Sequence, residues 1–508
     1  MPVAIAMSKK FQSIRRILGV LGLTLQFFTF AAAQEMHVEL KIDGKRPNEV
    51  RVTGRFETAR PANESHVLAF AESMAGVSLS AQRISSPSAR DKAGKELLLV
   101  TSPRCCIATG SINSFSYTVD LTSTKNIRAD AHSSWIRDRN GVLMLGDLLP
   151  QEFLPSGNNR AAEIRLDLPE GWKTFSTAKI SPPDKLEVDD IDSAVVFVGK
   201  DWDYVGMEHR GSYFKILTNG EFQFERYEPG IIGGAIIQEY FGRFGGLRAE
   251  GYLIAIFRPI ASVGEWEADT RGRTALIATT GTPFKSQSLQ QLDEQMRHEL
   301  FHFWIPNGVA LRGRYDWFYE GFALYSSLRL AVDSNTIRFD DMLGTLGAAF
   351  QGSEELAARR GLIELSKRRF SGFERQMYAK GLWFAFLCDL ALNISSNGKR
   401  NTDHVVKELY QKHPLGSPVV DGNDAVLKLL NSYPELRPLV DQYVTSNRGD
   451  EQKALINSMA LLENAGLSLT TVAGRTKLEV KAKLSSRQKA ILDKLGYNSW
   501  RKLVKDSK

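Results

Sequence analysis

Residues 288–302 read Ser-Leu-Gln-Gln-Leu-Asp-Glu-Gln-Met-Arg-His-Glu-Leu-Phe-His, and this stretch constrains the architecture more than any other. Its apolar residues recur at spacings of three and four, the period of an amphipathic helix: Leu289, Leu292, Met296, Leu300 and Phe303. Ser288, with Gln291 three residues later, predicts the N-cap of this helix. His298 and His302 then lie on one helical face, because side chains four positions apart are stacked along the axis.

A second apolar helix, predicted over residues 317–332, begins with Trp-Phe-Tyr-Glu-Gly-Phe. Its Glu320 lies 18 residues after His302, so two imidazoles and a carboxylate can meet between neighbouring helices. Zinc in hydrolases takes three protein ligands and leaves a fourth position for water. The sequence therefore predicts one Zn²⁺ ion held by His298, His302 and Glu320, with Glu299 beside it. The alternative is that the two histidines are core residues and the glutamate a carboxylate favoured by a helix N-terminus.

The rest of the chain predicts an α+β fold with a β-rich front. Short alternating stretches, broken by Gly, Pro and Asn, occur over residues 37–42, 50–53 and 162–168 and favour an antiparallel sandwich. We expect this front to support the fold or to control substrate access. Further strands are predicted over residues 194–198, 235–237, 253–257 and 274–279. Three glycines before the second of these, Gly230, Gly233 and Gly234, are interpreted as turn residues.

Helices follow the first strand-rich part. Beyond the two described above, they are predicted over residues 354–367, 375–393, 425–430 and 451–462. The predicted domains are a signal peptide at 1–33, a β-sandwich-like domain at 34–170, a mixed catalytic domain at 171–400 and a helical region at 401–508.

Length and composition are those of a multidomain globular protein. The 508 residues exceed one hydrophobic core, and 43% hydrophobic with 24% charged residues argues against disorder. The net charge is +7, but residues 1–33 contribute four positive charges and residues 475–508 a net eight. Because the remainder is acidic, the overall charge does not predict a nucleic-acid partner.

Both ends of the sequence carry distinctive patterns. Basic residues precede an apolar run at 17–30, and three alanines at 31–33 suit cleavage before Gln34, as in an export signal. We expect an exported protein, periplasmic or secreted, without a transmembrane helix once the leader is removed; an uncleaved anchor is the alternative. The basic tail predicts either weak contact with an anionic surface or a solvated helix docked by Ile491, Leu492, Leu495 and Trp500.

The histidine motif with its distant glutamate resembles the gluzincin metallopeptidases, the superfamily of thermolysin and aminopeptidase N. Residues 298–304 (His-Glu-Leu-Phe-His-Phe-Trp) and 317–322 are similar to aminopeptidase N-like and glycyl-aminopeptidase-like enzymes. Residues 378–389 begin with Tyr-Ala-Lys-Gly and resemble the Tyr-x-Lys-Gly helix start of both families. The resemblance implies a thermolysin-like catalytic domain that binds zinc and hydrolyses peptides or proteins.

The same resemblance implies a role for each site residue. His298, His302 and Glu320 would bind zinc, with each imidazole oriented by a hydrogen-bond acceptor. Glu299 would take a proton from a zinc-bound water and pass it to the leaving amine. Tyr378 would stabilise the oxyanion; the alternative is a buried tyrosine at a helix start.

An aminopeptidase must also hold the free amine of its substrate. The related enzymes use a glutamate on an edge strand, and Gly264-Glu-Trp-Glu267 lies 31 residues before His298, so Glu267 is the candidate. Its alternative is a solvated charge on a loop. The Gly-Ala-Met-Glu-Asn motif of aminopeptidase N is absent. An aminopeptidase is thus favoured, with an endopeptidase of the same mechanism or a non-catalytic zinc-containing envelope scaffold as alternatives.

Overall fold

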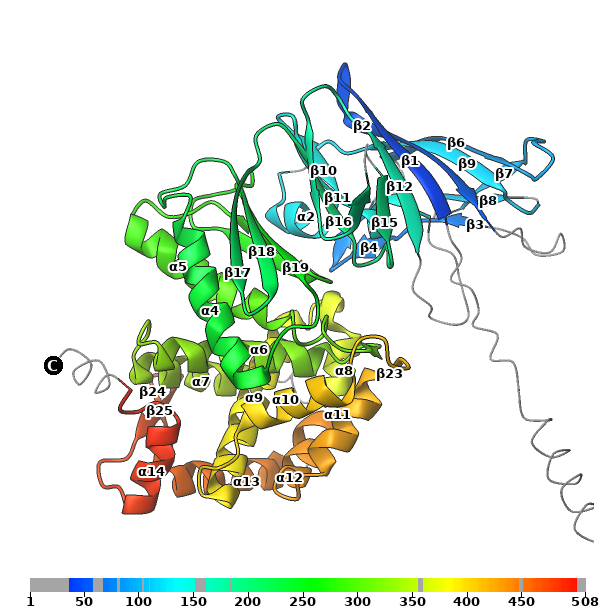
Figure 1. Cartoon of the computed structure of the whole chain (residues 1–508). Coiled ribbons are helices and arrows are strands. Elements are labelled where there is room, and N and C mark those ends of the chain that lie inside the picture. The colour runs from blue at the N-terminus through cyan, green and yellow to red at the C-terminus, as the bar shows by residue number, and fades with distance from the viewer. Residues whose placement is uncertain are drawn as a thin grey trace, which may run out of the picture.

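The structure, a computed structural model, describes residues 36–57, 67–79, 83–102, 105–108, 110–123, 125–150, 161–181, 185–354, 360–446 and 451–499. The predicted leader with its cleavage point, and Trp500 in the tail, lie outside these residues. Figure 1 shows a sheet-rich N-terminal part at the upper right and a mostly helical C-terminal part below it. This arrangement confirms the predicted order of strands first and helices later.

The N-terminal region, residues 36–199, contains two main sheets. The larger has the strand order β14-β15-β12-β1-β2-β9-β6. Its strands are β1 (Met36–Asp43), β2 (Arg46–Phe56), β6 (Ile84–Arg90), β9 (Ser114–Asp120), β12 (Ala162–Asp167), β14 (Lys179–Ser181) and β15 (Lys185–Val188). The smaller has the order β10-β11-β16-β13, formed by β10 (Trp135–Arg137), β11 (Asn140–Met144), β13 (Lys173–Ser176) and β16 (Val195–Gly199). Alternate residues of both sheets, among them Val38 and Val196, share one buried cluster.

Short elements complete this region. They are β3 (Val67–Ala69), β4 (Ser73–Met74), β5 (Val77–Ser78), β7 (Leu99–Ser102), β8 (Cys105–Ala108), α2 (Ile127–His132) and α3 (Leu145–Leu148). The predicted domain boundary at residue 170 falls inside the larger sheet, because β15 pairs with β12. Strand β16 also pairs with β11, which belongs to the N-terminal region. The strands up to Gly199 therefore belong to the sheets of the N-terminal region, and the next sheet begins after it.

A five-stranded sheet follows, with the order β17-β18-β19-β21-β20. Its strands are β17 (Asp203–His209), β18 (Ser212–Asn219), β19 (Gly251–Phe257), β20 (Trp266–Arg271) and β21 (Thr274–Thr279). The strands predicted at 253–257 and 274–279 are both present and fully buried, as expected of apolar runs in a covered parallel sheet. Strand β20 is antiparallel to β21 and forms one edge of the sheet, so only one of its two sides is paired with another strand of this sheet.

The strand predicted at 235–237 is wrong, and so is the assignment of the glycines before it to turns. Both lie in α4 (Glu228–Phe244), which has Pro229 at its start. Ile236, Tyr240 and Phe244 are buried at spacings of four, so the helical period was present in the sequence. Gly233 packs against side chains of the sheet and of the next helix, which explains a small residue on the buried face.

The helix α5 (Lys285–Phe301) begins three residues before the predicted N-cap. Ser288 lies inside it, and its hydroxyl accepts a hydrogen bond from the Thr282 backbone N–H (2.8 Å), which ties the preceding loop to the helix. The helices after it are α6 (Asp316–Asp333), α7 (Phe339–Ser353), α8 (Leu362–Lys367), α9 (Glu374–Ser396), α10 (Thr402–Lys412), α11 (Gly422–Asn431), α12 (Arg437–Leu439) and α13 (Glu451–Ala465). The prediction at 354–367 is only partly helical among the described residues, and α7 was not predicted.

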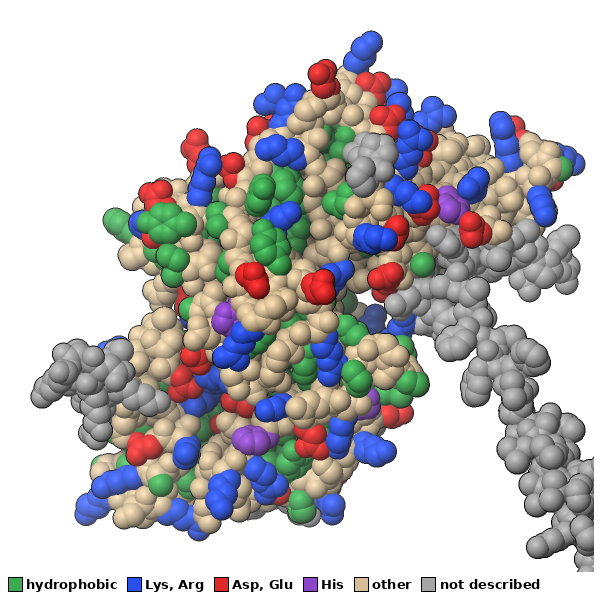
Figure 2. Space-filling model, in the orientation of Figure 1, with side chains coloured by type: hydrophobic (Ala, Val, Ile, Leu, Met, Phe, Trp, Pro, Cys, Tyr) green, Lys and Arg blue, Asp and Glu red, His purple; other side chains and the backbone are tan. Residues whose placement is uncertain are grey.

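Two further features bear on the sequence predictions. Among the described residues one helix, α9, is long and apolar enough to cross a membrane, and it is mostly buried inside the protein. In the tail, a hairpin of β24 (Leu467–Val472) and β25 (Arg475–Val480) precedes α14 (Ser486–Lys494). Ile491, Leu492 and Leu495 are buried, so this helix is docked. Figure 2 shows Lys and Arg side chains around the bottom of the molecule, where α13 and α14 lie in Figure 1.

Candidate metal centre

Two packed helices bring the predicted ligands together. His298 lies in the last turn of α5, and His302 follows that helix as its C-cap. Glu320 lies in the first turns of α6, which begins at Asp316 and packs against α5. The three groups each offer one ligand atom, and these atoms all lie within 4.8 Å of one another.

The distances between the donor atoms fit a tetrahedral zinc ion. Nε2 of His298 lies 3.1 Å from Oε2 of Glu320 and 3.2 Å from Nε2 of His302. The remaining distance among the three ligand atoms, from His302 Nε2 to Glu320 Oε2, is 3.7 Å. Two donors at tetrahedral angles, each about 2.0–2.1 Å from zinc, are about 3.3 Å apart. Two imidazoles and one carboxylate are also a donor set that zinc prefers, so the residues fit the ion.

The two imidazoles differ in their supporting contacts. Nδ1 of His302 donates its hydrogen to the backbone carbonyl of Ile305 (3.0 Å), because a carbonyl can only accept. Because Nδ1 carries the hydrogen, Nε2 of His302 keeps its lone pair, which is directed at the candidate ligand atoms of His298 and Glu320. Nδ1 of His298 has no hydrogen-bond partner among the described residues, so the acceptor expected for this ring is not found there.

Burial and neighbouring charges shift the pKa values of all three groups. Burial lowers the pKa of His302 to about 4, although Glu320 opposes the shift. Burial would also lower the pKa of His298, but the hydrogen bond with Glu320 and the nearby carboxylates raise it. Burial would raise the pKa of Glu320, but Arg369 and the two imidazoles hold it well below its usual range. The centre therefore presents an ionised carboxylate beside a neutral His302 ring at neutral pH.

Glu299 lies in the same pocket, next to the metal ligands on α5. Its side chain is buried, and its Oε2 accepts a hydrogen bond from the Thr270 hydroxyl (2.7 Å) on β20. Burial raises the pKa of Glu299 to about 7, against the opposing effect of His298. Thr270 was not singled out from the sequence, because only the fold brings the edge strand against the end of α5.

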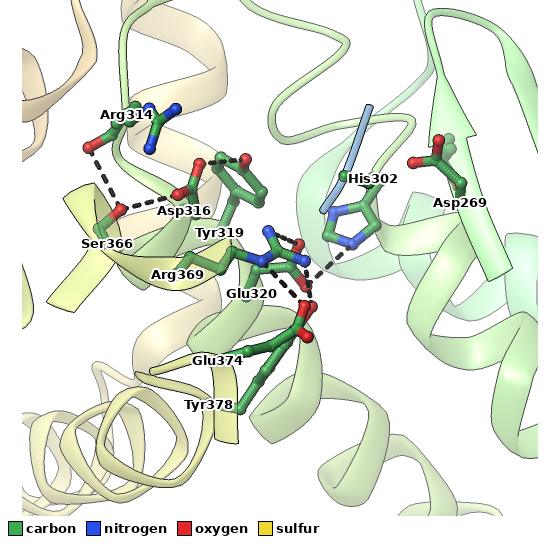
Figure 3. Close-up of polar contacts among 12 residues, drawn as sticks. Asp269, His302, Arg314, Asp316, Tyr319, Glu320, Ser366, Arg369, Glu374 and Tyr378 are labelled. Carbon is green, nitrogen blue, oxygen red and sulfur yellow. Dashed lines mark hydrogen bonds and ion pairs between the residues drawn. The ribbon is translucent and has the colours of Figure 1, made fainter. Parts of the chain in front are cut away.

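Arg369 is the main site residue that sequence reasoning missed. It lies in a short 3₁₀ helix, Arg369–Ser371, between α8 and α9. Its guanidinium donates to Glu320 Oε1 (3.0 Å) and to the hydroxyl of Tyr378. Figure 3 shows the Arg369 side chain close to Glu320, with Glu374 and Tyr378 next to them. An arginine outside any motif gives no sequence signal, since the contact depends on how α6 and α9 pack.

Tyr378 lines the same pocket as the three candidate ligands, from α9. Burial, reinforced by the Glu320 carboxylate, raises the pKa of Tyr378. Its phenol therefore keeps its proton at neutral pH and can donate it in a hydrogen bond.

A second hydrogen-bonded group supports the site from α6. Tyr319 donates to Oδ1 of Asp316 (2.7 Å), and Ser366 donates to Oδ2 of the same carboxylate (2.8 Å). The ring of Tyr319 packs edge-on against that of His302, with 5.8 Å between centroids. These contacts, visible in Figure 3, fix one face of the His302 ring.

Glu267 is part of the edge strand β20 and not of a loop. Its side chain is about one-third exposed and lines the same pocket as the metal ligands. Its Oε1 lies 3.3 Å from Nε2 of His132, the last residue of α2 in the N-terminal region. Nδ1 of His132 lies 3.1 Å from Asp269 on β20. The structure thus brings Glu267 to the pocket and adds His132 and Asp269, which the sequence did not single out.

The pocket has a volume of about 230 Å³ and lies where the N-terminal region meets α5, α6 and α9. The N-terminal region contributes Ala75, Arg128 and His132 to its wall. Arg128 forms a two-bond ion pair with Glu374 of α9 (2.9 and 2.8 Å) and donates to the Ala75 carbonyl (3.0 Å). Such paired bonds fix orientation as well as distance, so they hold this wall against the metal centre.

No family model matches the chain, and no curated protein matches it in sequence. Its structure resembles an aminopeptidase N family protein from Idiomarina loihiensis, with a TM-score of 0.67 and 17% identity, covering 89% of this chain and 82% of that one. It also resembles an M1 zinc metallopeptidase from Deinococcus radiodurans, with a TM-score of 0.54 and 14% identity over 81% of this chain and 94% of that one. A mutant of an M1 zinc metallopeptidase from the same organism, bound to Tyr-Ser-Ala, is similar with a TM-score of 0.55 and 15% identity. This match covers 82% of this chain and 94% of that one.

These likenesses show that the chain has the fold of the aminopeptidase N family and M1 zinc metallopeptidases. The resemblance predicted from the histidine motif is therefore confirmed at the level of the fold.

Proposed function

We propose that the protein is a zinc-dependent metallopeptidase that hydrolyses peptide bonds, with a preference for the N-terminus of its substrates. The observation that carries this proposal is the convergence of three ligand atoms, from His298, His302 and Glu320, beside a buried carboxylate. A structural histidine pair has no need to bring its two Nε2 atoms and a carboxylate oxygen to one point, whereas a zinc ion takes this donor set. The likeness to M1 zinc metallopeptidases supports the same reaction class.

His298, His302 and Glu320 would hold the zinc ion. When bound, zinc acts as a Lewis acid that lowers the pKa of water and polarises a carbonyl group. The hydrogen bond from His302 to Ile305 and the contact between Arg369 and Glu320 orient two of the ligands before any ion binds.

Glu299 is placed to move the proton. Its Oε2 is held by Thr270, so the carboxylate has a fixed direction in the pocket. We propose that it takes a proton from the attacking water and later delivers it to the leaving amine. Burial keeps this carboxylate away from bulk solvent, so the proton stays within the site.

Tyr378 and Arg369 act on the carbonyl side. The Tyr378 hydroxyl accepts a hydrogen bond from Arg369, so its own hydrogen is free to be donated towards the oxygen that becomes negative. An arginine that donates to a phenol makes that phenol a stronger donor, which favours this role. We propose that Tyr378 stabilises the developing oxyanion and that Arg369 positions it.

Glu267 is the candidate for recognising the substrate's free amine. It lies on the edge strand, and an extended peptide can pair with the open edge of a sheet. A carboxylate at this place would pair with an N-terminal ammonium and leave the first peptide bond at the metal centre. Action on exported peptides in the periplasm or outside the cell follows from the composition of residues 1–33 and is proposed on that ground alone.

The variant Glu299→Gln tests the proposed function. It keeps the size and the hydrogen bond from Thr270 but removes the base, so we expect zinc content to stay at the wild-type level. Hydrolysis of a mixed peptide library, followed by mass spectrometry, should fall by about 10²–10⁴-fold. Glu294→Gln on the exposed face of the same helix is the matched control and should cleave normally. Cleavage by Glu299→Gln at the wild-type rate, or cleavage unaffected by a chelator, would refute the mechanism.

A further inference from the structure

His132 is a buried histidine of the N-terminal region whose side chain contacts the edge strand β20. It ends α2, and its side chain is only 7% exposed. Two carboxylates of β20 lie beside its ring: Glu267 is hydrogen-bonded to Nε2 at 3.3 Å, and Asp269 lies 3.1 Å from Nδ1 at ion-pair distance without hydrogen-bond geometry. The mechanism proposed above does not use this residue.

The geometry indicates that this imidazole carries a positive charge. A neutral ring has a single N–H and presents a lone pair at its other nitrogen, which a carboxylate would repel. Two carboxylates within 3.3 Å of one buried ring favour its protonated form, because an opposite charge at this distance stabilises the cation. Burial would lower the pKa of His132, but Asp269 and Glu267 raise it to about 9, which agrees with this protonation state.

The other charged groups near His132 leave its attraction for the Glu267 carboxylate in place. Arg271 pairs with Asp269 (2.8 Å) and donates to the His132 carbonyl (2.8 Å), so Asp269 is shared between two cations. Arg128, one turn earlier on α2, is paired with Glu374 of α9. Glu299 of α5 lies in the same pocket and is held by Thr270. Among the described residues, Glu267 is hydrogen-bonded to His132, while Arg128, though paired with Glu374, lines the same pocket and also attracts the Glu267 carboxylate.

We propose that His132 is a specificity-determining residue: its imidazolium occupies Glu267 and competes with the N-terminal ammonium of a substrate. This inference rests on the proposed function, in which Glu267 recognises that ammonium. Two cations that share one carboxylate repel each other, so each weakens the binding of the other. The protein accordingly discriminates less between free and blocked N-termini than its edge-strand glutamate alone would allow.

The test compares one peptide in two forms, with a free and with an acetylated N-terminus, at neutral pH. The measured quantity is the ratio of their kcat/KM values for the wild type, His132→Gln and His132→Asn. Removing the cation should raise this ratio about tenfold, mainly through a lower KM for the free peptide. His37→Gln is the matched control, because His37 also faces two carboxylates, Glu57 and Glu163, but lies in β1 away from the pocket. It should leave the ratio unchanged.

The outcomes separate this inference from the proposed function. If the wild type cleaves both forms equally and every variant does so too, Glu267 does not recognise the amine and that part of the proposed function fails. If the wild type prefers the free form and the ratio stays constant or falls on removing His132, the competition is refuted. Circular dichroism must show that both variants are folded before their ratios are compared, because His132 also neighbours Asp269, a contact that the substrate does not displace.

Discussion

The guanidinium of Arg369 contacts both the Glu320 carboxylate and the Tyr378 hydroxyl, so one side chain links a metal ligand to the candidate oxyanion donor. Removing it in Arg369→Met leaves Glu320 without the donor that fixes its orientation. We expect the dissociation constant for zinc to rise about 10–100-fold, with a similar loss of turnover, as is usual for groups that hold a metal ligand. Competition with a fluorescent zinc chelator measures the first effect.

Arg368→Met is the matched control for this change. Arg368 precedes Arg369 in the chain but is half-exposed and pairs with Glu364 on the surface. It should leave zinc affinity unchanged. Equal zinc affinity and equal turnover in both variants would show that Arg369 is not part of the centre.

His132 also predicts a pH dependence of stability. Its folded pKa, about 9, lies above the ordinary value of 6.5, so the contribution is complete below pH 6.5 and is lost as the pH rises through 9. We expect the wild type to be more stable than His132→Gln by about 2–3 kcal/mol at pH 6 and by much less at pH 10. Thermal unfolding of both proteins across this range measures the difference. A gap that is constant or grows with pH would mean that the ring is not charged.

Among the elements, the crossing of α6 and α9 sets the distance between Glu320 and Tyr378. Gly321 follows Glu320, and a Cβ atom there would lie 2.6–2.8 Å from the backbone of Gly381 in α9. The two helices therefore touch through glycines, and Gly321→Ala must push them apart. We expect a loss of about 1–3 kcal/mol in stability, typical of overpacking, with reduced turnover.

Gly344→Ala provides the comparison on a neighbouring helix. Gly344 lies on an exposed face of α7, and a Cβ there meets nothing within 4 Å. It should stabilise the protein by about 0.5–1 kcal/mol, because alanine favours the helix. Chemical denaturation of the two variants is the measurement. A neutral Gly321→Ala would contradict the close crossing.

The elements that sequence predicted well are those with a clear period. The helices α5 and α6 follow from apolar residues three and four apart, and this period places His298 and His302 on one face of the first helix and Glu320 in the second. Helix α4 was missed because its glycines suggested turns, although Ile236 and Tyr240 keep the helical spacing. The spacing of apolar residues predicts a helix correctly where one helical face is buried. It is misinterpreted where glycines occur in a helix because they allow close packing and not because they form a turn.

The contacts of Arg369, Thr270 and His132 could not be predicted in the same way. Each joins segments far apart in the chain, and each depends on how whole layers pack, which no local spacing encodes. The edge position of Glu267 was expected from the family resemblance, but its pairing with His132 was not.

At the scale of the whole molecule, the pocket belongs to both halves of the chain. The N-terminal region was expected to support the fold or control access, and it forms one wall of the pocket through Arg128 and His132. The ion pair of Arg128 with Glu374 ties that wall to α9, the helix that carries Tyr378. Substrate selection therefore involves residues from outside the helices that hold the metal ligands.

The zinc K-edge X-ray absorption spectrum of the purified full-length chain tests the central claim most directly. We expect one zinc per chain with four nitrogen or oxygen neighbours at about 2.0–2.1 Å, and outer-shell scattering from two imidazoles, as three protein ligands and one water require. A sample without zinc, a sulfur neighbour at about 2.3 Å, or a spectrum without imidazole scattering would contradict a centre formed by His298, His302 and Glu320.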